Sequence, residues 1–110
     1  MIRTIPDLTA FLTDFKADHG IEWAFHQFWT PPASNQFIVW IDMGDTPMAA
    51  DNVAYFSQPG FAIELYSKKD RAFEIEVELA DALTKTGTYF RRLPAEYLES
   101  EGVWLTPFYI

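Results

Sequence analysis

Few residues of the types that carry out chemistry occur in this chain. The two histidines, His19 and His26, fall at a predicted helix end and in a predicted strand, where a polar cap and an outward-facing side chain are their ordinary roles. Cysteine is absent, which excludes disulfides, thiolate zinc sites and cysteine nucleophiles. We therefore predict no metal site and no thiol redox chemistry, and we expect a reducing compartment or a particle that does not rely on disulfides.

Carboxylates are plentiful, but nothing in the sequence pairs them for acid–base work. Glu74, Glu76 and Glu78 are interpreted as a solvated face, since a general acid would require one of them to be buried with a raised pKa. The chain also lacks a glycine-rich phosphate loop, a serine elbow and a His-Glu-x-x-His motif. We predict that the protein is not an enzyme and that it uses no cofactor.

Length, charge and composition exclude several further classes of protein. The 110 residues suffice for one hydrophobic core, so residues 1–110 are predicted to form a single domain. Eight Lys and Arg against sixteen Asp and Glu give a net charge of −8, which disfavours specific nucleic-acid binding. An apolar fraction of 49% with 17% aromatic residues excludes an intrinsically disordered chain.

Neither a membrane span nor a signal peptide is expected. No segment reaches the roughly 18 consecutive apolar residues of a transmembrane helix, and the first residues, MIRTIP, show no signal-peptide core. These features predict a protein made and kept in the cytoplasm, with no membrane partner.

The first predicted element is an amphipathic helix. Thr4 is expected to cap its start, with Asp7 completing a capping box, and Gly20 supplies the left-handed position that ends it. Its apolar stripe has the spacing of one helix face and comprises Leu8, Phe11, Leu12 and Phe15.

Strand patterns follow the helix. Four runs alternate between apolar and polar side chains, namely residues 21–29, 36–43, 53–56 and 60–66. The first two are predicted to form an antiparallel hairpin around the proline-containing residues 30–35, and all four to form a meander. Residues 44–52 are predicted to be the longest irregular loop.

A second helix and a group of C-terminal strands complete the predicted fold. Residues 70–87 begin with Asp70, end with Gly87 and have helix dimensions, although Phe73 to Leu79 also alternate like a strand. The apolar arc of this helix is wider than one contact needs, which indicates cover on two sides. Short and final strands are expected at 89–93 and 102–109. The predicted fold class is α+β, with a mostly antiparallel sheet flanked by two helices.

Aromatic side chains exceed what a chain of this length needs for its core. Both faces of the predicted sheet carry large apolar residues, whereas two helices can cover only one face, so we predict self-association. The hypothesised subunit contacts are Trp40, Trp104 and Phe108, with the protein core as their alternative role. A strongly curved sheet that closes on its own second face is the alternative to an oligomer.

Two segments resemble a known family. Residues 63–70, IELYSKKD, lead from a strand to a helix, and residues 97–101, YLESE, precede the last strand. This pattern, over residues 61–109, resembles the small head-tail connection and tail-terminator proteins of long-tailed phages and prophages. The resemblance implies an α+β fold assembled as a ring, commonly a hexamer. Such a ring caps the tail tube at the head-tail junction of the virion, after assembly in the host cytoplasm.

The resemblance also implies partners and roles for individual residues. The partners would be copies of the chain itself, the major tail protein and head-connector proteins. Lys68, Lys69 and Asp70 are predicted to form the turn and N-cap of the second helix. Asp45, Pro47 and Met48, in the predicted loop 44–52, are hypothesised to dock on a partner, a plain mobile loop being the alternative.

Two other functions fit parts of the sequence. An acidic and aromatic small protein could mimic DNA or bind a host protein, which predicts carboxylates along one elongated face. A curved sheet lined with aromatic residues could instead enclose a small-molecule pocket, which predicts a cavity with convergent polar groups. The sequence offers few polar candidates for such a pocket.

Overall fold

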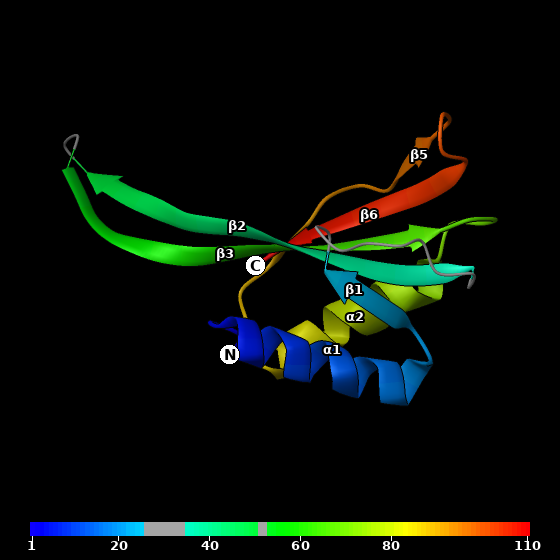
Figure 1. Ribbon diagram of the computed structural model, residues 1–110, viewed down its shortest axis with the longest axis horizontal. Coiled ribbons are helices and arrows are strands. Elements are labelled where there is room, and N and C mark those ends of the chain that lie inside the picture. Colours follow the sequence, from blue (N-terminus) through cyan, green and yellow to red (C-terminus); the bar gives the residue numbers. More distant parts are fainter. Residues whose placement is uncertain (26–34, 51–52) are drawn as a thin grey trace.

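In the part of the chain that the structure describes, a six-stranded sheet with two helices packed on one face forms the fold (Figure 1). The computed structural model describes residues 1–25, 35–50 and 53–110. The predicted α+β class, with a mostly antiparallel sheet, is confirmed. In chain order the elements are α1 (Ile5–His19), β1 (Glu22–Phe25), β2 (Gln36–Ala50), β3 (Val53–Ser67), α2 (Phe73–Lys85), β4 (Arg91–Arg92), β5 (Glu96–Leu98) and β6 (Val103–Tyr109).

Helix α1 begins and ends as its sequence predicts. The Thr4 hydroxyl accepts a bond from the Asp7 backbone N–H at 3.2 Å, and the Asp7 carboxylate accepts bonds from the backbone N–H groups of Arg3 and Thr4 at 3.1 Å each. These bonds, that from Arg3 foremost, lower the pKa of Asp7. Gly20 ends the helix at a φ of 69°, in the left-handed region that favours glycine.

Helix α2 begins later than predicted. Its N-cap is Ala72, which makes no side-chain capping bond, so the predicted cap at Asp70 is wrong. The Asp70 carbonyl instead accepts a bond from the Ser67 hydroxyl, which keeps Asp70 in the connection from β3. Gly87 follows the C-cap with a φ of 74°, as expected for a glycine that ends a helix.

The sheet has the strand order β1-β2-β3-β6-β4, with β5 also paired to β6. Strand β1 runs parallel to β2, so the predicted antiparallel hairpin is wrong. An alternating pattern gives the faces of a strand but not its direction, which explains the error. The rest of the predicted strand 21–29 and most of the connection after it lie outside the described residues.

Strands β2 and β3 form one long antiparallel hairpin. Its pairing runs from Gln36 opposite Ser67 to Ala50 opposite Val53, with register shifts after Asp42 and Met48. The predicted loop 44–52 is therefore wrong, because residues 44–50 belong to β2. The predicted strands 53–56 and 60–66 are likewise parts of one strand, β3, so the four-stranded meander is wrong as well.

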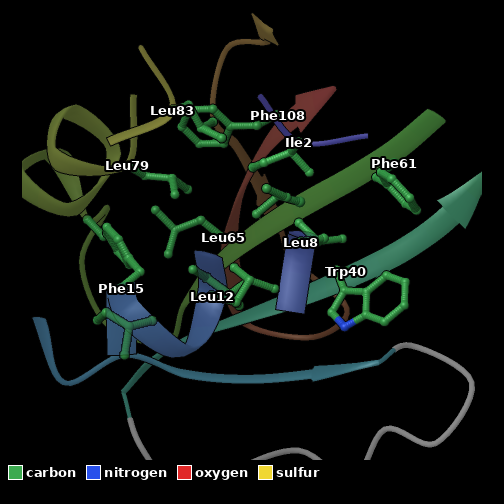
Figure 2. Close-up of a cluster of buried hydrophobic side chains, with 14 residues drawn as sticks. Ile2, Leu8, Leu12, Phe15, Trp40, Phe61, Leu65, Leu79, Leu83 and Phe108 are labelled. Carbon is green, nitrogen blue, oxygen red and sulfur yellow. The ribbon is translucent and has the colours of Figure 1, made fainter. Parts of the chain in front are cut away.

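The main core lies between the sheet and the two helices (Figure 2). From α1 come Leu8, Leu12 and Phe15, which confirms the predicted stripe apart from the half-buried Phe11. The side chains that meet them from the sheet and from α2 include Ile38, Trp40, Phe61, Ile63, Leu65, Leu79, Leu83 and Phe108.

The second sheet face also holds buried side chains. Phe37, Val39, Tyr66 and Val103 form a separate cluster, against which Leu98 of β5 and Leu105 of β6 pack. The rings of Phe37 and Tyr66 stack with centroids 5.2 Å apart. This part of the second face is thus buried within one chain, as expected if the sheet closes on itself rather than on a partner.

Candidate functional site

The three aromatic residues predicted to contact other subunits lie in different environments. Trp40 and Phe108 are only 5% and 0% exposed and belong to the main core, which is the alternative role that the sequence allowed. Neither side chain is available to a partner in this conformation. Trp104 is half-buried and meets the ring of Tyr97 edge-on, with centroids 5.3 Å apart. A subunit contact at Trp104 remains a prediction.

The three residues of the predicted docking loop lie in a strand. The backbones of Asp45, Pro47 and Met48 pair with Pro59, Ser57 and Phe56 of β3. Proline is tolerated there because a two-stranded ribbon leaves one side of each strand without a ladder partner. That these residues dock on a partner stays a prediction, but it now concerns a strand and not a loop.

The outer half of the β2–β3 hairpin projects from the body (Figure 1). We call residues 44–50 and 53–60 the arm. Among the described residues the arm strands pair only with each other, since β1 pairs with residues 37–40 and β6 with residues 62–67. Seven residues of strand extend about 20 Å. The radius of gyration, 14.7 Å, accordingly exceeds the roughly 13 Å of a compact chain of this length.

A second exposed feature is an apolar patch on α2. Phe73 and Val77 lie one turn apart and are 61% and 54% exposed. Together with Glu74 and Glu78 they line a shallow, open depression, and we call these four residues the α2 patch. The sequence predicts that α2 is covered on two sides, but no described residue covers the side that carries Phe73 and Val77.

An ion pair between half-buried Arg71 and buried Glu76 holds the start of the α2 patch in place. Arg71 donates two hydrogen bonds, of 2.9 and 3.0 Å, to the Glu76 carboxylate, which is only 2% exposed. The predicted solvated face is therefore wrong at Glu76. The guanidinium of Arg71 lies 4.2 Å from the centroid of the Phe73 ring, a cation–π distance. The hydrogen bonds to Glu76 raise the pKa of Arg71 further above its already high usual value. The guanidinium that lies against the Phe73 ring is therefore charged at every ordinary pH.

A third exposed feature lies beyond the other end of α2. Tyr89 is 90% exposed, yet its neighbours fix the backbone on both sides. Buried Thr88 accepts a bond of 2.8 Å from the backbone N–H of Ile2, and the Phe90 ring packs at 6.1 Å from Phe108. The exposed Arg91 and Arg92 follow in β4. The exposure of Tyr89 could not be predicted from the sequence, because a single tyrosine beside a short strand gives no periodic signal.

The charges near these features differ in sign. In the α2 patch, Glu78 accepts a contact of 2.8 Å from His19 Nδ1, while exposed Glu74 has no ion pair among the described residues. Beyond the far end of α2, Arg91 and Arg92 likewise have no ion pair with any described residue. The two ends of α2 therefore offer unpaired charges of opposite sign.

In residues 1–25, 35–50 and 53–110, no three His, Asp or Glu side chains gather as a metal site would require. A second open depression adjoins the α2 patch beside Arg71 and Gln36. No helix among the described elements has the length and apolar character to span a membrane.

The chain was compared with known proteins by sequence and by structure. No protein-family model, no curated protein and no solved structure matches it.

Proposed function

We propose that the protein is a structural subunit that assembles with copies of itself into a ring. Its place would be the head-tail junction of a long-tailed phage or prophage, where the ring caps the tail tube and meets the head connector. The major tail protein and the connector proteins are the proposed partners. In this role the chain acts by binding and not by catalysis.

The arm is the observation that carries this proposal. A two-stranded ribbon is marginally stable alone in water, and its outer strand sides carry backbone groups that another chain can pair with. A neighbouring copy in a ring would supply the missing cover. The arm sequence, residues 44–60, has no Lys or Arg, so it is suited to a neutral or basic surface.

The order of elements after residue 60 also supports the proposal. The IELYSKKD segment runs from β3 into the connection before α2, and YLESE runs from β5 into the turn before β6. Both segments thus lie at junctions between elements, as the tail-terminator resemblance requires of them.

The exposed carboxylates favour a ring over a DNA mimic. Asp14 and Asp18 lie on α1, while Glu99 and Glu101 lie in the turn between β5 and β6. Figure 1 shows α1 below the sheet and the turn between β5 and β6 at the upper end of the sheet. A mimic of the DNA backbone needs its charges along one face, and these four residues do not share one.

Light scattering coupled to gel filtration, with negative-stain microscopy of the same fraction, tests the proposed function. The chain is measured over a wide concentration range, alone and with tail tubes assembled from the major tail protein of a long-tailed phage. We expect closed rings, either free or at the tube end. A monomer that stays monomeric at every concentration and leaves the tubes bare would contradict the proposal.

A further inference from the structure

We infer that the α2 patch of one copy binds the segment around Tyr89 of the next copy, head to tail. The inference rests on the proposed ring and names one contact that would build it. The segment, which we call the Tyr89 anchor, comprises Tyr89, Arg91 and Arg92. Tyr89 would cover Phe73 and Val77, and the two arginines would meet the Glu74 and Glu78 carboxylates.

The exposure of the apolar side chains is the first argument. Phe73, Val77 and Tyr89 are each more than half exposed, and Tyr89 is 90% exposed. Aromatic side chains bury a large area with few rotatable bonds, which makes them common anchors at the centres of interfaces. All three occupy fixed backbone positions, either in α2 or beside the buried Thr88.

Preorganisation is the second argument. On the α2 patch, Arg71 is held by two bonds to buried Glu76 and lies against the Phe73 ring. At the anchor, the Thr88 hydroxyl accepts a bond from the backbone N–H of Ile2 and also lies 2.7 Å from the hydroxyl of Thr86. Surfaces that are already ordered lose less conformational entropy when they bind.

The third argument is that the α2 patch and the Tyr89 anchor carry opposite charges, which favours a second copy of the chain as the partner. The patch presents Glu74, which has no ion pair among the described residues, and Glu78, which His19 also contacts, whereas the anchor presents Arg91 and Arg92. With a net charge of −8, two copies repel each other overall, so a contact between them needs local pairs of opposite charge. The anchor supplies two of the eight basic residues of the chain in adjacent positions.

The position of the two surfaces gives the symmetry of the contact. Phe73 is the first residue of α2 and Tyr89 lies four residues beyond its last residue, Lys85. A helix of this length spans about 20 Å. Because patch and anchor are different surfaces of one chain, a pair of copies leaves the patch free on one copy and the anchor free on the other. Such contacts are heterologous and generate rings when the rotation between copies closes.

One aromatic contact is too small for a stable interface by itself. Interfaces of stable complexes bury about 1,200–2,000 Å² in total, whereas one tyrosine buries about 150–250 Å². The arm of the neighbouring copy would supply much of the remaining area. We therefore expect single substitutions in the patch or anchor to weaken the ring without unfolding the chain.

The test compares substitutions by light scattering and sedimentation velocity. Tyr89→Ala and Glu74→Lys should each raise the dissociation constant of the ring at least tenfold. Tyr89→Phe should retain assembly, and Glu99→Lys is the matched charge control on the far turn. Adding Arg91→Glu and Arg92→Glu to the Glu74→Lys variant should restore part of the lost affinity.

A mixing experiment tests the head-to-tail geometry directly. Val77→Asp disrupts the α2 patch but leaves the Tyr89 anchor intact, whereas Tyr89→Asp disrupts the anchor but leaves the patch intact. Each variant alone should therefore be monomeric. Their mixture retains one good patch and one good anchor, and it should give dimers but no rings.

The outcomes separate this inference from the proposed function. If the wild type forms rings and Tyr89→Ala and Glu74→Lys leave them unchanged, the inference is overturned while the ring stands. If the mixture of the two Asp variants gives no dimer although the wild type forms rings, the head-to-tail contact is also overturned. If the wild type never self-associates, both the contact and the ring are overturned.

Discussion

At the scale of single residues, the α2 patch depends on a buried charge. Glu76 keeps its carboxylate 2% exposed because Arg71 satisfies both oxygens. Removing one member of such a pair leaves the other charge buried without compensation, which is more damaging than replacing both. The same arginine lies against Phe73, so stability and the shape of the patch depend on one side chain.

Arg71→Met should lower the midpoint of thermal unfolding by several degrees, because Glu76 loses both of its bonds. The double variant Arg71→Met with Glu76→Leu should recover most of the loss. Thermal unfolding followed by circular dichroism measures both. If the single variant melts at the wild-type temperature, the carboxylate does not depend on Arg71.

Tyr66 makes the stability of the fold sensitive to high pH. Burial foremost, and then the Glu64 carboxylate that accepts its hydroxyl bond at 3.2 Å, raises the pKa of Tyr66 well above its usual value. The unfolded phenol ionises near pH 10, so this contribution to stability is complete below that pH and is lost as the pH rises beyond it.

Tyr66→Phe should remove that dependence. Above about pH 10 the wild type should lose stability relative to the variant by at most about 1.4 kcal/mol per pH unit. Urea unfolding at pH 8 and at several values above 10 measures the difference. Parallel losses in the two proteins would show that Tyr66 ionises equally easily in the folded state.

Single residues were predicted unevenly from the sequence. Thr4, Asp7 and Gly20 were correct because capping bonds are local and depend on residues a few positions apart. The burial of Glu76 was missed because its partner lies outside the alternating run, at Arg71. The exposure of Phe73 depends on tertiary packing, which the apolar pattern of a helix does not reveal.

At the scale of elements, the capping box of α1 makes a measurable contribution. Thr4→Ala removes the hydroxyl that accepts the Asp7 N–H and should cost about 1 kcal/mol of unfolding free energy. Thr13→Ala, at an exposed position inside the same helix, is the matched control and should cost nothing, since alanine favours helix. Urea denaturation of both variants gives the comparison. Equal effects would rule out the cap as the cause.

The arm should be dispensable for folding and required for assembly. Residues 43–60 are replaced by Asn-Gly, a two-residue turn that suits a hairpin between Asp42 and Phe61. The core pairs of β2 with β1 and of β3 with β6 lie outside this segment, so the far-ultraviolet spectrum and cooperative unfolding should persist. Light scattering should then report a monomer. A variant that still forms rings would show that the arm is not an assembly element.

The elements themselves were predictable where the signal is local. Helix α1 and the last strand, Val103–Tyr109, follow from periodicity and end signals. The presence of α2 follows from its length and from Gly87, whereas its predicted start at Asp70 is wrong. The direction of β1 was wrong because pairing is a tertiary property. The low strand propensity of Gly44, Pro47 and the small residues predicts a loop at 44–52, but the pairing of residues 44–50 with β3 overrides that propensity.

At the scale of the whole molecule, the surplus aromatic side chains lie in two kinds of environment. Part of it fills the second sheet face, where Phe37 and Tyr66 stack within one chain. Another part stays exposed at Phe73 and Tyr89, at either end of α2. The surplus therefore correctly indicated that both sheet faces are apolar, whereas the residues first proposed for contacts, Trp40 and Phe108, are used by the core.

Native mass spectrometry of the unmodified chain at increasing concentration tests the central claim, self-assembly into a ring, most directly. We predict one discrete species at a fixed multiple of the 12.7 kDa subunit mass, with no open-ended series of larger species. A spectrum that shows only the 12.7 kDa monomer at every concentration, with or without tail tubes, would contradict the account.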